Sequence, residues 1–552
     1  MDEFDVAIVG AGAAGSILAA RLSEDSSRRV VVVEAGSDMP PDSPPEDIQD
    51  EFPVAYSNPA YFWPGLTAIA AADRGESPFP QARVMGGGSS VMGMWALRGM
   101  PDDYNAWRDA GAAGWSWDDV LPFFRKLESD LDRSGPMHGA DGPIPIRRHK
   151  PESWPLFVGR LVDAARRAGL PLREDINGDF ENGVFPVPVT NDKRGRVSSA
   201  IGYLTPNVRR RTNLTILTNA ETKCVILNER RASGLELADG RRILCREVIA
   251  SAGAIGSPAL LCRSGIGPAA ELAALGITPT IDLPGVGKNL QNHCIVNFAT
   301  RIARAGRQER SMRTYGLACA RLSSGLEGGR PGDLHLQFIT KTSLHPHGDR
   351  VGIVGAALYG PLSRGRVSLE SVGARIAPKV EFRLLENPLD QLRMRRVAGI
   401  AMKLLSDPAV RKLRDEIYTI APSSIVRRLN RPGPINRLLS TLLAAALDSP
   451  WPIRRSIMER AGRRLSEASL ESRDGDEALA DLSPIFHPVG TCAMGPDSDP
   501  LSVLDASCRV RGVGGLSVID ASVMPVIPTG NTCLPTMMVA ERAAQLFAAH
   551  RP

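Results

Sequence analysis

The chain of 552 residues lacks several features that would place it in whole classes of protein. Its eight cysteines show neither CxxC nor another metal-ligand spacing, and its first residues do not resemble a signal peptide. We therefore expect a cytoplasmic protein without disulfides, because the cytoplasm keeps thiols reduced. No apolar run approaches the ~18–20 residues that span a bilayer. The nearest, Leu438–Leu447, contains Ser440 and Thr441.

Strong net charge and aromatic residues are also scarce. The net charge of +5 is small for this length, so no nucleic-acid partner is expected. Aromatic residues make up 5% of the chain, which favours a binding pocket that is not strongly aromatic. With 43% apolar and 23% charged residues, the composition is that of an ordinary globular protein. The length suggests about two to four domains.

The sequence does contain a dinucleotide-binding fingerprint near its start. The apolar strand Val6–Val9 runs into Gly10-x-Gly12-x-x-Gly15, a helix of small residues follows, and a second apolar strand ends at Glu34. Gly10 permits a tight turn, Gly12 lets the backbone approach a pyrophosphate, and Gly15 lets the helix pack on the strand. The helix N-terminus attracts phosphates, and Glu34, 19 residues after Gly15, is placed to bind a ribose. The fingerprint alone does not distinguish NAD from FAD.

Beyond the fingerprint, apolar periodicity predicts elements on both sides of a long central region. Residues 37–77, rich in Pro and Asp, are expected to be irregular. The other expected elements are short strands at 214–217, 224–227 and 248–251, a hairpin turn at Asp239-Gly240, an antiparallel sheet within 333–385, helices at 151–170, 388–415 and parts of 435–470, a strand at 516–520 and a helix at 536–550.

These elements indicate an α/β fold, α+β overall, with two domains that are each assembled from separate segments. The first is a Rossmann-like cofactor domain, and the second is a substrate-binding or cap domain with an antiparallel sheet flanked by helices. The cofactor domain is expected to contain residues 1–40, 78–130, 190–295 and 485–552, and the substrate domain residues 41–77, 131–189 and 296–484.

Two further glycine-rich stretches follow along the chain. Residues 86–90 (GGGSS) suit a loop that runs against a flat cofactor or its phosphates, with a tight turn between packed elements as the alternative. In residues 253–267 a strand leads into a helix that is expected to start at Pro258, with Ser257 as N-cap and Gly265 at its end.

Residues 253–267 also resemble a hallmark sequence of the glucose–methanol–choline (GMC) oxidoreductases, which are FAD enzymes that mostly oxidise alcohols. Residues 82–107 resemble the family's other hallmark. The similarity covers nearly the whole chain in order, and only residues 300–480 match loosely. The other matching pieces are HGADGPIPI (138–146), SSAIGYLTP (198–206), LPGVGKNLQNH (283–293), HPVGTCAMG (487–495) and LSVIDASVMPVIPTGNTCLPTMMVAERAA (516–544).

The resemblance implies FAD as the cofactor and assigns residues to it. The fingerprint would bind the ADP half, Val225 would meet the adenine through its backbone, and residues 85–95 would run beside the flavin. Asp520 and Ala521 would contact the flavin end or the pyrophosphate. The implied cofactor-binding residues are Gly10, Gly12, Ala13, Ala14, Gly15, Glu34, Ala35, Met85, Gly87, Gly88, Ser90, Met92, Gly93, Met94, Trp95, Val225, Ala252, Gly253, Asp520, Ala521, Asn531 and Thr532.

The resemblance also implies two catalytic residues. His487 matches the family's catalytic base, and Asn531 matches its second active-site position. Oxidising an alcohol removes a hydroxyl proton and an α-hydride, and the hydride goes to flavin N5. The protein therefore needs a proton acceptor and a fixed geometry, which an imidazole and an amide can supply.

The sequence departs from the family pattern at three positions. Met92 stands where the family usually has Asn or His, so flavin tuning can differ there. Val91 stands at the attachment position of the covalent His–flavin link of some members, so non-covalent FAD is expected. Asn292 replaces a common Asp, with no consequence that the sequence reveals.

Two other patterns permit alternative interpretations. His345 and His347 could suggest a metal pair, but no ligand cluster accompanies them, and a solvated loop and no metal site are expected. Residues 421–473 hold ten arginines against four acids around an apolar stretch. They form either a basic surface for an anionic membrane or partner, or a cap or exposed helical face.

We therefore expect an FAD-dependent oxidase or dehydrogenase for a small primary alcohol, with oxygen or another compound as electron acceptor. The motifs are most similar to the bacterial branch that oxidises aryl and furfuryl alcohols. Three alternatives stay open at this point. They are a non-redox member of the same scaffold (hydroxynitrile lyase or photodecarboxylase-like), an NAD enzyme, and a membrane-associated dehydrogenase that uses residues 421–473.

Overall fold

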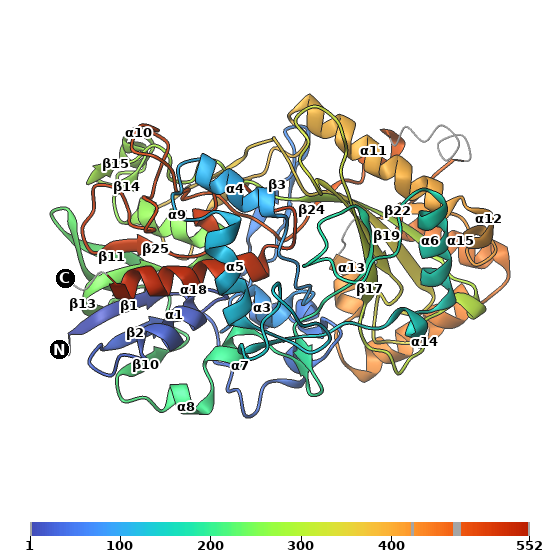
Figure 1. Cartoon of the computed structure of the whole chain (residues 1–552), viewed down its shortest axis with the longest axis horizontal. Coiled ribbons are helices and arrows are strands. Elements are labelled where there is room, and N and C mark those ends of the chain that lie inside the picture. Colours follow the sequence, from blue (N-terminus) through green and yellow to red (C-terminus); the bar gives the residue numbers. More distant parts are fainter. Residues whose placement is uncertain (1–2, 421–423, 467–475, 550–552) are drawn as a thin grey trace.

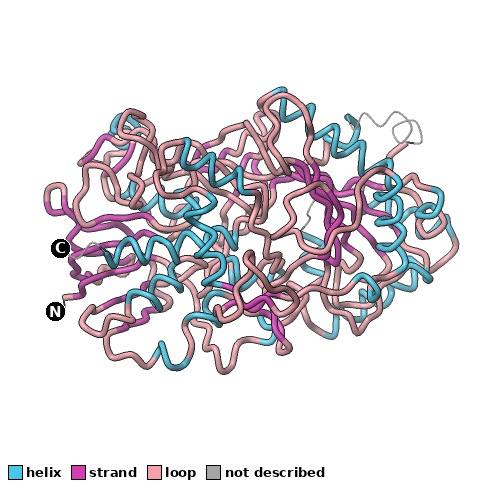
Figure 2. Tube along the Cα trace, in the orientation of Figure 1, coloured by secondary structure: helices cyan, strands magenta, loops and turns pink. Residues whose placement is uncertain are grey.

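A computed structural model of the protein describes residues 3–420, 424–466 and 476–549. Both chain ends lie at the same end of the elongated molecule, beside the sheet that contains β1 (Phe4–Val9) (Figure 1). A second sheet lies toward the other end, so the strands form two groups along the long axis (Figure 2). The fold is mixed α/β, as the sequence predicts.

The first group is a seven-stranded sheet with the order β10-β2-β1-β13-β12-β11, in which β25 also pairs with β13. Strands β1, β2, β10, β13 and β25 run parallel, and β11 and β12 are antiparallel additions. All four valines of β2 are buried, as expected for a parallel strand that is covered on both faces. The strands other than β1 are β2 (Val30–Val33), β10 (Leu214–Leu217), β11 (Thr222–Asn228), β12 (Arg231–Leu237), β13 (Arg242–Ala250) and β25 (Leu516–Val518).

The fingerprint forms the strand, turn, helix and strand that its spacing predicts. Strand β1 ends at Val9, Gly10 adopts a φ of +94° in the turn, and helix α1 (Gly15–Leu22) follows. The C-terminal helix α18 (Cys533–Ala549) packs against α1, so the two ends of the sequence build one side of this region (Figure 1). Helix α18 begins three residues before the predicted start, and the predicted end at residue 550 lies outside the described residues.

Helix α9 (Gly253–Arg263) corrects the prediction that the helix starts at Pro258 after an N-cap at Ser257. The helix begins five residues earlier, and Ser257 instead donates its hydroxyl to Asp520 at 2.6 Å. Pro258 lies inside the helix and has no N–H for the carbonyl of Ala254. The Thr491 hydroxyl donates to that carbonyl at 2.6 Å instead, so the proline is tolerated. The predicted end at Gly265, with a φ of +80°, is confirmed.

The second group is an eight-stranded sheet whose paired strands are antiparallel. Its apolar face packs against helices α6 (Leu156–Arg167) and α11 (Pro388–Leu405), which form a second core with it. Its strands are β7 (Gly183–Pro186), β16 (Cys294–Arg301), β17 (Gly316–Leu322), β18 (Leu334–Ile339), β19 (Val351–Leu358), β22 (Tyr418–Ile420), β23 (Arg463–Arg464) and β24 (Ser483–Pro484).

The prediction of one antiparallel sheet within 333–385 is only half correct. Strands β18 and β19 belong to the eight-stranded sheet, but β20 (Arg366–Ser368) and β21 (Lys379–Glu381) do not. They form a separate four-stranded sheet with β3 (Thr67–Ile69) and β4 (Glu76–Pro78). Residues 37–77 are therefore less irregular than expected, because β3 pairs with β4 on one side and with β21, from a distant part of the chain, on the other.

The remaining elements are short or lie at the periphery. The hairpin predicted at Asp239-Gly240 joins β12 to β13, and Gly240 has a φ of +88°. The other helices and turns are α2 (Glu46–Gln49), η1 (Val54–Ser57), η2 (Pro59–Tyr61), α3 (Gly88–Val91), α4 (Pro101–Asp109), α5 (Trp117–Leu127), η3 (Pro151–Ser153), α7 (Ser199–Tyr203), α8 (Pro206–Arg209), α10 (Ala269–Ala274), η4 (Arg304–Gly306), α12 (Pro408–Arg411), α13 (Ser424–Leu429), α14 (Pro434–Leu447), α15 (Trp451–Ala461), α17 (Asp476–Leu479) and η5 (Ala521–Val523). The other strands are β5 (Glu128–Asp130), β6 (Ile144–Ile146), β8 (Asn191–Asp192), β9 (Gly195–Arg196), β14 (Ile266–Gly267) and β15 (Ile281–Asp282).

The predicted division into two domains stays a proposal, although the sheets are consistent with it. Every strand of the seven-stranded sheet falls within residues 1–40, 190–295 and 485–552. The eight-stranded sheet draws its strands from residues 183–186, 294–358, 418–464 and 483–484. The proposed boundaries at 295/296 and 484/485 therefore fall close to the ends of strands.

Candidate active site

A cavity of about 860 Å³ joins the fingerprint to the predicted catalytic pair. It is lined by residues of the first β–α turn, of the loop before α3, of the N-terminal part of α9, of the segment 485–488 and of the segment that follows β25. Ligand pockets of small molecules and cofactors have volumes of roughly 300–1,000 Å³. The predicted residues that line this cavity are Gly10, Gly12, Ala13, Ala14, Glu34, Ala35, Gly87, Gly88, Met92, Gly93, Met94, Trp95, Ala252, Gly253, His487, Asp520, Ala521, Asn531 and Thr532.

Three of the predicted cofactor residues lie behind the cavity wall and support it. A Cβ at Gly15 would lie 1.8 Å from the carbonyl oxygen of Gly10, so Gly15 serves the close packing of α1 on β1. Met85 is fully buried, and the hydroxyl of Ser90, also fully buried, donates to its carbonyl at 2.8 Å. These residues shape the glycine-rich loops without lining the cavity.

The expected contact between the Val225 backbone and the adenine stays a prediction. Val225 does not line the cavity, and its N–H donates to the hydroxyl of Ser264 at 2.8 Å. Glu221 and Thr222, at the start of the same strand, line the cavity instead. Glu221 and Thr222 were not predicted, because the apolar run in the sequence indicates a strand only from residue 224, whereas β11 begins at Thr222.

The fingerprint end of the cavity has the donors that a pyrophosphate requires. In the described part of the chain, no acceptor pairs with the backbone N–H groups of Gly12, Ala13 and Ala14, which precede α1. Helix N-termini with free N–H groups bind phosphate through hydrogen bonds and through the helix dipole. Each oxygen of Glu34 accepts one backbone N–H, from Ala11 and from Gly36, at 2.8 Å, which leaves lone pairs for a ribose diol. This end of the cavity therefore fits a dinucleotide.

Asp520 organises another part of the cavity wall through four hydrogen bonds. One oxygen accepts the Gly253 N–H and the Ser257 hydroxyl, and the other accepts the N–H and the hydroxyl of Ser522. Burial raises the pKa of this carboxyl, whereas the four donors favour its charged form. A carboxylate has about four acceptor sites. Asp520 therefore holds the first turn of α9 against the end of β25, and its oxygens have no further site for a ligand.

His487 and Asn531 meet at the cavity, as the resemblance implied. The Nδ2 of Asn531 lies 3.1 Å from Nε2 of His487, and Asn531 Oδ1 accepts the hydroxyl of Tyr359 at 3.3 Å. A third residue, His293, completes the arrangement. Its Nδ1 lies 2.9 Å from Nδ1 of His487, and its Nε2 lies 3.1 Å from the carbonyl oxygen of Pro528.

These partners determine which nitrogen of His487 is free to accept a proton. A carbonyl can only accept, so Nε2 of His293 carries the hydrogen, and Nδ1 of the neutral ring is an acceptor. His487 must then donate its Nδ1–H to His293, and the lone pair of its unprotonated Nε2 accepts an N–H of the Asn531 amide beside the cavity. Burial lowers the pKa of His487 to about 3 and the pKa of His293 well below its usual value. Both rings are therefore neutral, and Nε2 is the unprotonated nitrogen of His487.

Asn292 holds the backbone of the base, which explains its departure from the common Asp. Its Oδ1 accepts the His487 N–H at 3.1 Å, and its Nδ2 donates to the carbonyl of Ile485 at 2.6 Å. An aspartate could accept the first bond but could not donate the second. Sequence reasoning noted Asn292 without a role and did not select His293, although both lie in the same motif.

Met92 and Val91, the two other departures, face different environments. Met92 lines the cavity, while its carbonyl accepts a guanidinium N–H of Arg196 at 2.6 Å. Val91 is fully buried in the core and does not line the cavity. At position 92 the cavity therefore meets the thioether of Met92 instead of the hydrogen-bonding side chain of an Asn or His.

The cavity is more aromatic than the composition suggested. Tyr56, Trp63, Trp95, Tyr315 and Phe486 all line it. The rings of Trp95 and Tyr315 stack with centroids 5.9 Å apart. This corrects the expectation drawn from the low aromatic content, because five of the 28 Phe, Trp and Tyr residues line this one cavity.

Two glycines make room for this stacked pair. A Cβ at Gly93 would lie 2.0 Å from the hydroxyl oxygen of Tyr315, and one at Gly316 would lie 2.5 Å from the indole of Trp95. Gln337 of β18 also lines the cavity and donates to the hydroxyl of Tyr359 at 3.2 Å. Tyr315 and Gln337 were not predicted, because they belong to the central region without a recognised motif.

Comparison with known proteins decides the family. Two family models, both described as GMC oxidoreductase, match residues 4–295 and 361–540. The chain belongs to the GMC oxidoreductase family. It is an FAD-dependent alcohol oxidoreductase, in agreement with the predicted fold, cofactor class and type of reaction.

Several characterised proteins resemble this GMC oxidoreductase over their full length. It is 36% identical to 5-(hydroxymethyl)furfural oxidase of Methylovorus sp. (strain MP688), with 98% of each chain covered. It is 32% identical to the oxygen-dependent choline dehydrogenase of Photobacterium profundum, with 100% of this chain and 94% of the relative covered. Among solved structures, pyridoxine 4-oxidase from Mesorbium loti matches with a TM-score of 0.81 and 26% identity, over 100% of both chains.

Two interpretations made outside the cavity have a structural outcome. In the described part of this GMC oxidoreductase, no helix combines the length and the apolar character that crossing a membrane requires. The expected solvated loop at His345 and His347 is wrong for His347, which is buried. The backbone N–H of His347 donates to the hydroxyl of Ser440 at 3.1 Å, and its Nδ1 lies 2.6 Å from the same oxygen.

Acidification is expected to destabilise this GMC oxidoreductase through its buried neutral histidines. Burial lowers the pKa of His335 and of His487 to about 3 and that of His293 well below 6.5, whereas an unfolded histidine titrates near 6.5. The unfolded chain therefore binds more protons, and stability falls as the pH drops below about 6.5. Each such histidine costs about 2 kcal/mol at pH 5 relative to pH 7. Urea unfolding of the FAD-loaded enzyme at both pH values measures the loss.

The control for this prediction is His335→Phe. His335 stacks on Tyr359 with ring centroids 4.6 Å apart, and neither of its ring nitrogens has a hydrogen-bond partner in the described part of the chain. The phenyl ring keeps the stacking but cannot titrate. The variant should lose less stability between pH 7 and pH 5 than the parent, and an equal or larger loss would contradict the assignment.

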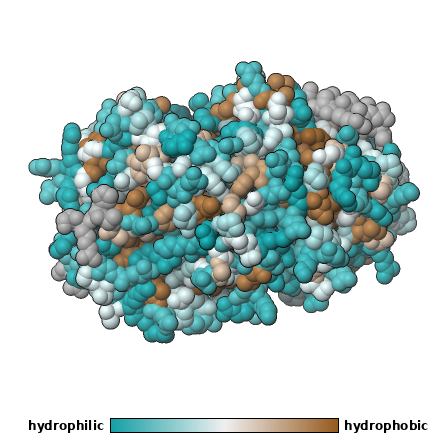
Figure 3. All heavy atoms as spheres, viewed as in Figure 1, coloured by the Kyte–Doolittle hydropathy of each residue, from teal (hydrophilic) through white to brown (hydrophobic). Residues whose placement is uncertain are grey.

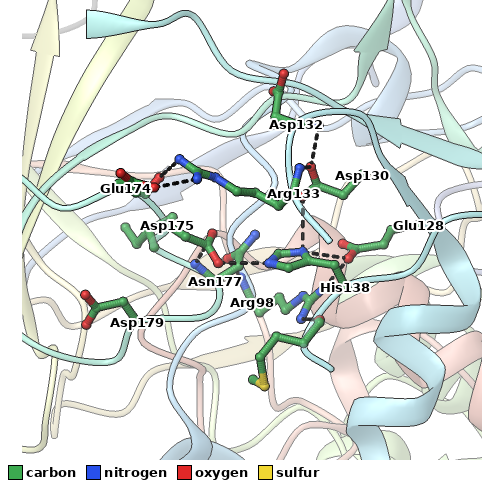
Figure 4. A network of polar contacts seen from close by, with 12 residues as sticks. Arg98, Glu128, Asp130, Asp132, Arg133, His138, Glu174, Asp175, Asn177 and Asp179 are labelled. Carbon is green, nitrogen blue, oxygen red and sulfur yellow. Dashed lines mark hydrogen bonds and ion pairs between the residues drawn. The ribbon is translucent and has the colours of Figure 1, made fainter. Parts of the chain in front are cut away.

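A separate cluster of buried charged residues surrounds His138, away from the residues that line the main cavity (Figure 4). Nδ1 of His138 lies 3.1 Å from Glu128, and Nε2 lies 2.8 Å from Asp175. Glu128, Asp130 and His138 have the mutual spacing of metal ligands. However, the guanidinium of Arg98 contacts Glu128, and that of Arg148 lies 2.8 Å from Asp130. The carboxylates are therefore already paired with cations, and the cluster serves as an ion-pair network.

Replacing His138 by asparagine is expected to cost about 3–5 kcal/mol of unfolding free energy at pH 7, because it removes the imidazolium that the buried carboxylates of Glu128 and Asp130 contact in addition to their arginines. Burial opposes the charged ring, but hydrogen bonds to Asp130, Asp175 and Glu128 raise the pKa of His138 to about 10. This contribution is complete below pH 6.5 and is lost as the pH rises through about 10. Urea unfolding provides the measurement.

Arg133→Gln is the matched control for His138→Asn. It breaks an exposed ion pair with Glu174, and exposed pairs contribute about 0–1 kcal/mol. If both variants lose the same small amount of stability, the network around His138 does not stabilise the fold.

Proposed function

We propose that this GMC oxidoreductase oxidises a primary alcohol attached to a small aromatic or heteroaromatic ring to the aldehyde. The observation that carries the proposal is the unprotonated Nε2 of His487, bonded to the Asn531 amide, in a cavity with a stacked wall of Trp95 and Tyr315. A flat ring can stack against this wall, because offset and edge-to-face aromatic contacts are favourable. The relative named 5-(hydroxymethyl)furfural oxidase supports the same class of substrate.

The residues fit FAD as the cofactor. The N–H groups of Gly12, Ala13 and Ala14 would hold the pyrophosphate, Glu34 the ribose, and residues 92–95 would line the flavin side. When bound, FAD accepts the hydride that leaves the α-carbon of the alcohol. Val91 is buried in the core and is not a residue that can form the histidyl link, so we propose non-covalent FAD.

His487 removes the proton of the alcohol in this proposal. The O–H bond breaks as an N–H bond forms at Nε2, and the Asn531 amide donates a hydrogen bond to the same oxygen. The Nδ1–H of His487 stays bonded to His293, so the ring does not turn away as it becomes charged. His293 is thus a positioning residue, and the surrounding apolar atoms exclude water from the charged pair.

The electron acceptor that we propose is oxygen, because the relatives include an oxidase and an oxygen-dependent dehydrogenase by name. A non-oxygen acceptor is the alternative. An oxygen electrode separates the two, since rapid oxygen consumption during turnover is expected for the oxidase. A cytoplasmic location stays a prediction from the sequence.

A panel of alcohols, monitored by anaerobic bleaching of the flavin, tests the substrate class. We expect furfuryl and benzyl alcohols to bleach the flavin at lower concentrations than aliphatic alcohols of similar size. Preference for aliphatic or charged alcohols would overturn the ring proposal. If no alcohol bleaches the flavin while a cyanohydrin releases cyanide, the protein is a lyase on the same scaffold.

A further inference from the structure

The outer face of helices α14 and α15 carries a cluster of exposed apolar side chains that the fold does not explain. Fourteen large hydrophobic residues are exposed in the described part of the chain, and six of them lie between residues 435 and 453. On the face shown in Figure 3, hydrophobic residues reach the surface at the end of the molecule where Figure 1 places both helices. We call the six residues the apolar patch: Ile435, Leu438, Leu439, Leu442, Trp451 and Ile453.

Helix α14 is apolar on two opposite sides. Its inner side buries Ser440, Ala444 and Leu447, and Ser440 is held by its hydrogen bonds with His347. Its outer side presents the patch residues at positions i, i+3, i+4 and i+7, which form one continuous stripe. Leu438 and Leu442 are 61% and 60% exposed. A helix at a water-facing surface normally has polar residues there, so the stripe needs an apolar cover.

The chain around the patch is strongly basic. Residues 424–466 contain nine arginines and two acidic residues, Asp448 and Glu459. Arg428, Arg437 and Arg460 form no ion pair with another residue that the structure describes, and all three are exposed. The rest of the predicted basic segment, residues 421–423 and 467–473, lies outside the described residues.

We propose that the apolar patch and its arginines dock this enzyme on an anionic lipid bilayer. An apolar helical face flanked by arginines lies in the plane of the interface, with its apolar side chains among the acyl chains and its cations on the headgroups. Trp451 suits this position, because its ring is 45% exposed while its indole N–H is already satisfied by Glu416 at 2.6 Å. A second copy of the chain is a poor cover, since two such surfaces would bring eighteen arginines together against four acids.

Sedimentation with vesicles tests the proposal on the full-length, FAD-loaded enzyme. One set of vesicles is phosphatidylcholine alone, and the other contains phosphatidylglycerol as about one third of the lipid. We expect the enzyme to sediment with the anionic set only, and the bound fraction to fall as salt is added. An enzyme that stays in solution with both sets would overturn the proposal.

Paired substitutions locate the surface. Leu438→Gln with Leu442→Gln should lower the affinity for anionic vesicles about tenfold or more, because both side chains leave the lipid. Leu131→Gln with Leu501→Gln removes equally exposed leucines, 55% and 53%, far from the patch in sequence and should not change binding. Alcohol turnover without vesicles should be unchanged in both, which shows that they fold. Equal binding by all three proteins would reject the patch as the lipid surface.

The same variants test whether a second copy of the chain, instead of a bilayer, covers the apolar patch. If light scattering shows that the parent is a dimer and the Leu438→Gln, Leu442→Gln variant is a monomer, while neither binds anionic vesicles, the patch is an interface between copies. That result overturns membrane docking. It leaves the proposed oxidation of alcohols untouched, because that proposal rests on His487 and the aromatic wall.

Discussion

Replacing His487 with alanine is expected to lower kcat/KM for the alcohol substrate about 10²–10⁴-fold, the usual contribution of a general base. The reason is that Nε2 is the unprotonated nitrogen of His487, and the bond from Nδ1–H to His293 holds the ring with Nε2 beside Asn531. The FAD content of the variant should not change, because the residues proposed to hold the pyrophosphate and the ribose are those of the fingerprint, and His487 is not one of them. Stopped-flow flavin reduction measures the loss of rate, and the absorbance ratio of flavin to protein measures the FAD content.

The comparison with two other histidines makes this prediction specific. His345→Ala alters a histidine outside the cavity and should retain full activity. His293→Leu should lose less activity than His487→Ala, because the base remains but its tautomer is no longer fixed. The acid limb of its kcat/KM profile should also move. Flavin reduction in His487→Ala at the parental rate would show that another group takes the proton.

Gly15→Ala is expected to destabilise the protein by about 3 kcal/mol or more and to abolish stable FAD binding. The added Cβ would lie 1.8 Å from the carbonyl oxygen of Gly10 and 2.9 Å from its carbonyl carbon, so α1 must move away from β1. That movement displaces the N–H groups of Gly12, Ala13 and Ala14. Thermal unfolding and the FAD content after gel filtration measure the two losses.

Gly159→Ala is the matched control for Gly15→Ala. Gly159 lies in helix α6, and a Cβ there would meet nothing within 4 Å. Alanine favours a helix over glycine by about 0.5–1 kcal/mol, so the variant should be as stable as the parent or slightly more stable. If Gly15→Ala behaves in the same way, the close packing of α1 on β1 does not hold the phosphate site.

The cofactor half of the fold could be predicted because its sequence signals are local. Gly10, Gly12 and Gly15 lie in one turn, and the apolar strands beside them are continuous in sequence. The start of α9 could not be predicted, because Thr491 satisfies the carbonyl that Pro258 leaves free from a distant part of the chain. The four-stranded sheet was missed for the same reason, since β3 and β21 come from separate segments.

The candidate site shows the same division. His487 and Asn531 lie in motifs that resemble a known family, so the sequence alone predicts both as site residues. His293 has no local signal that distinguishes it from a core histidine, and its role depends on Pro528, which lies far along the chain. Tyr315 and Gln337 lie in or beside strands of the eight-stranded sheet, where periodicity indicates burial and gives no information about which buried residues face a cavity.

The most direct test of the account is a single anaerobic turnover of the FAD-loaded enzyme with furfuryl alcohol and with its α-dideuterated form. We expect the flavin to bleach, one equivalent of aldehyde to appear per flavin, and the deuterated alcohol to react several-fold more slowly, because the α C–H bond breaks during hydride transfer. A flavin that stays oxidised with furfuryl, benzyl and aliphatic primary alcohols alike would contradict the central claim that this site oxidises alcohols.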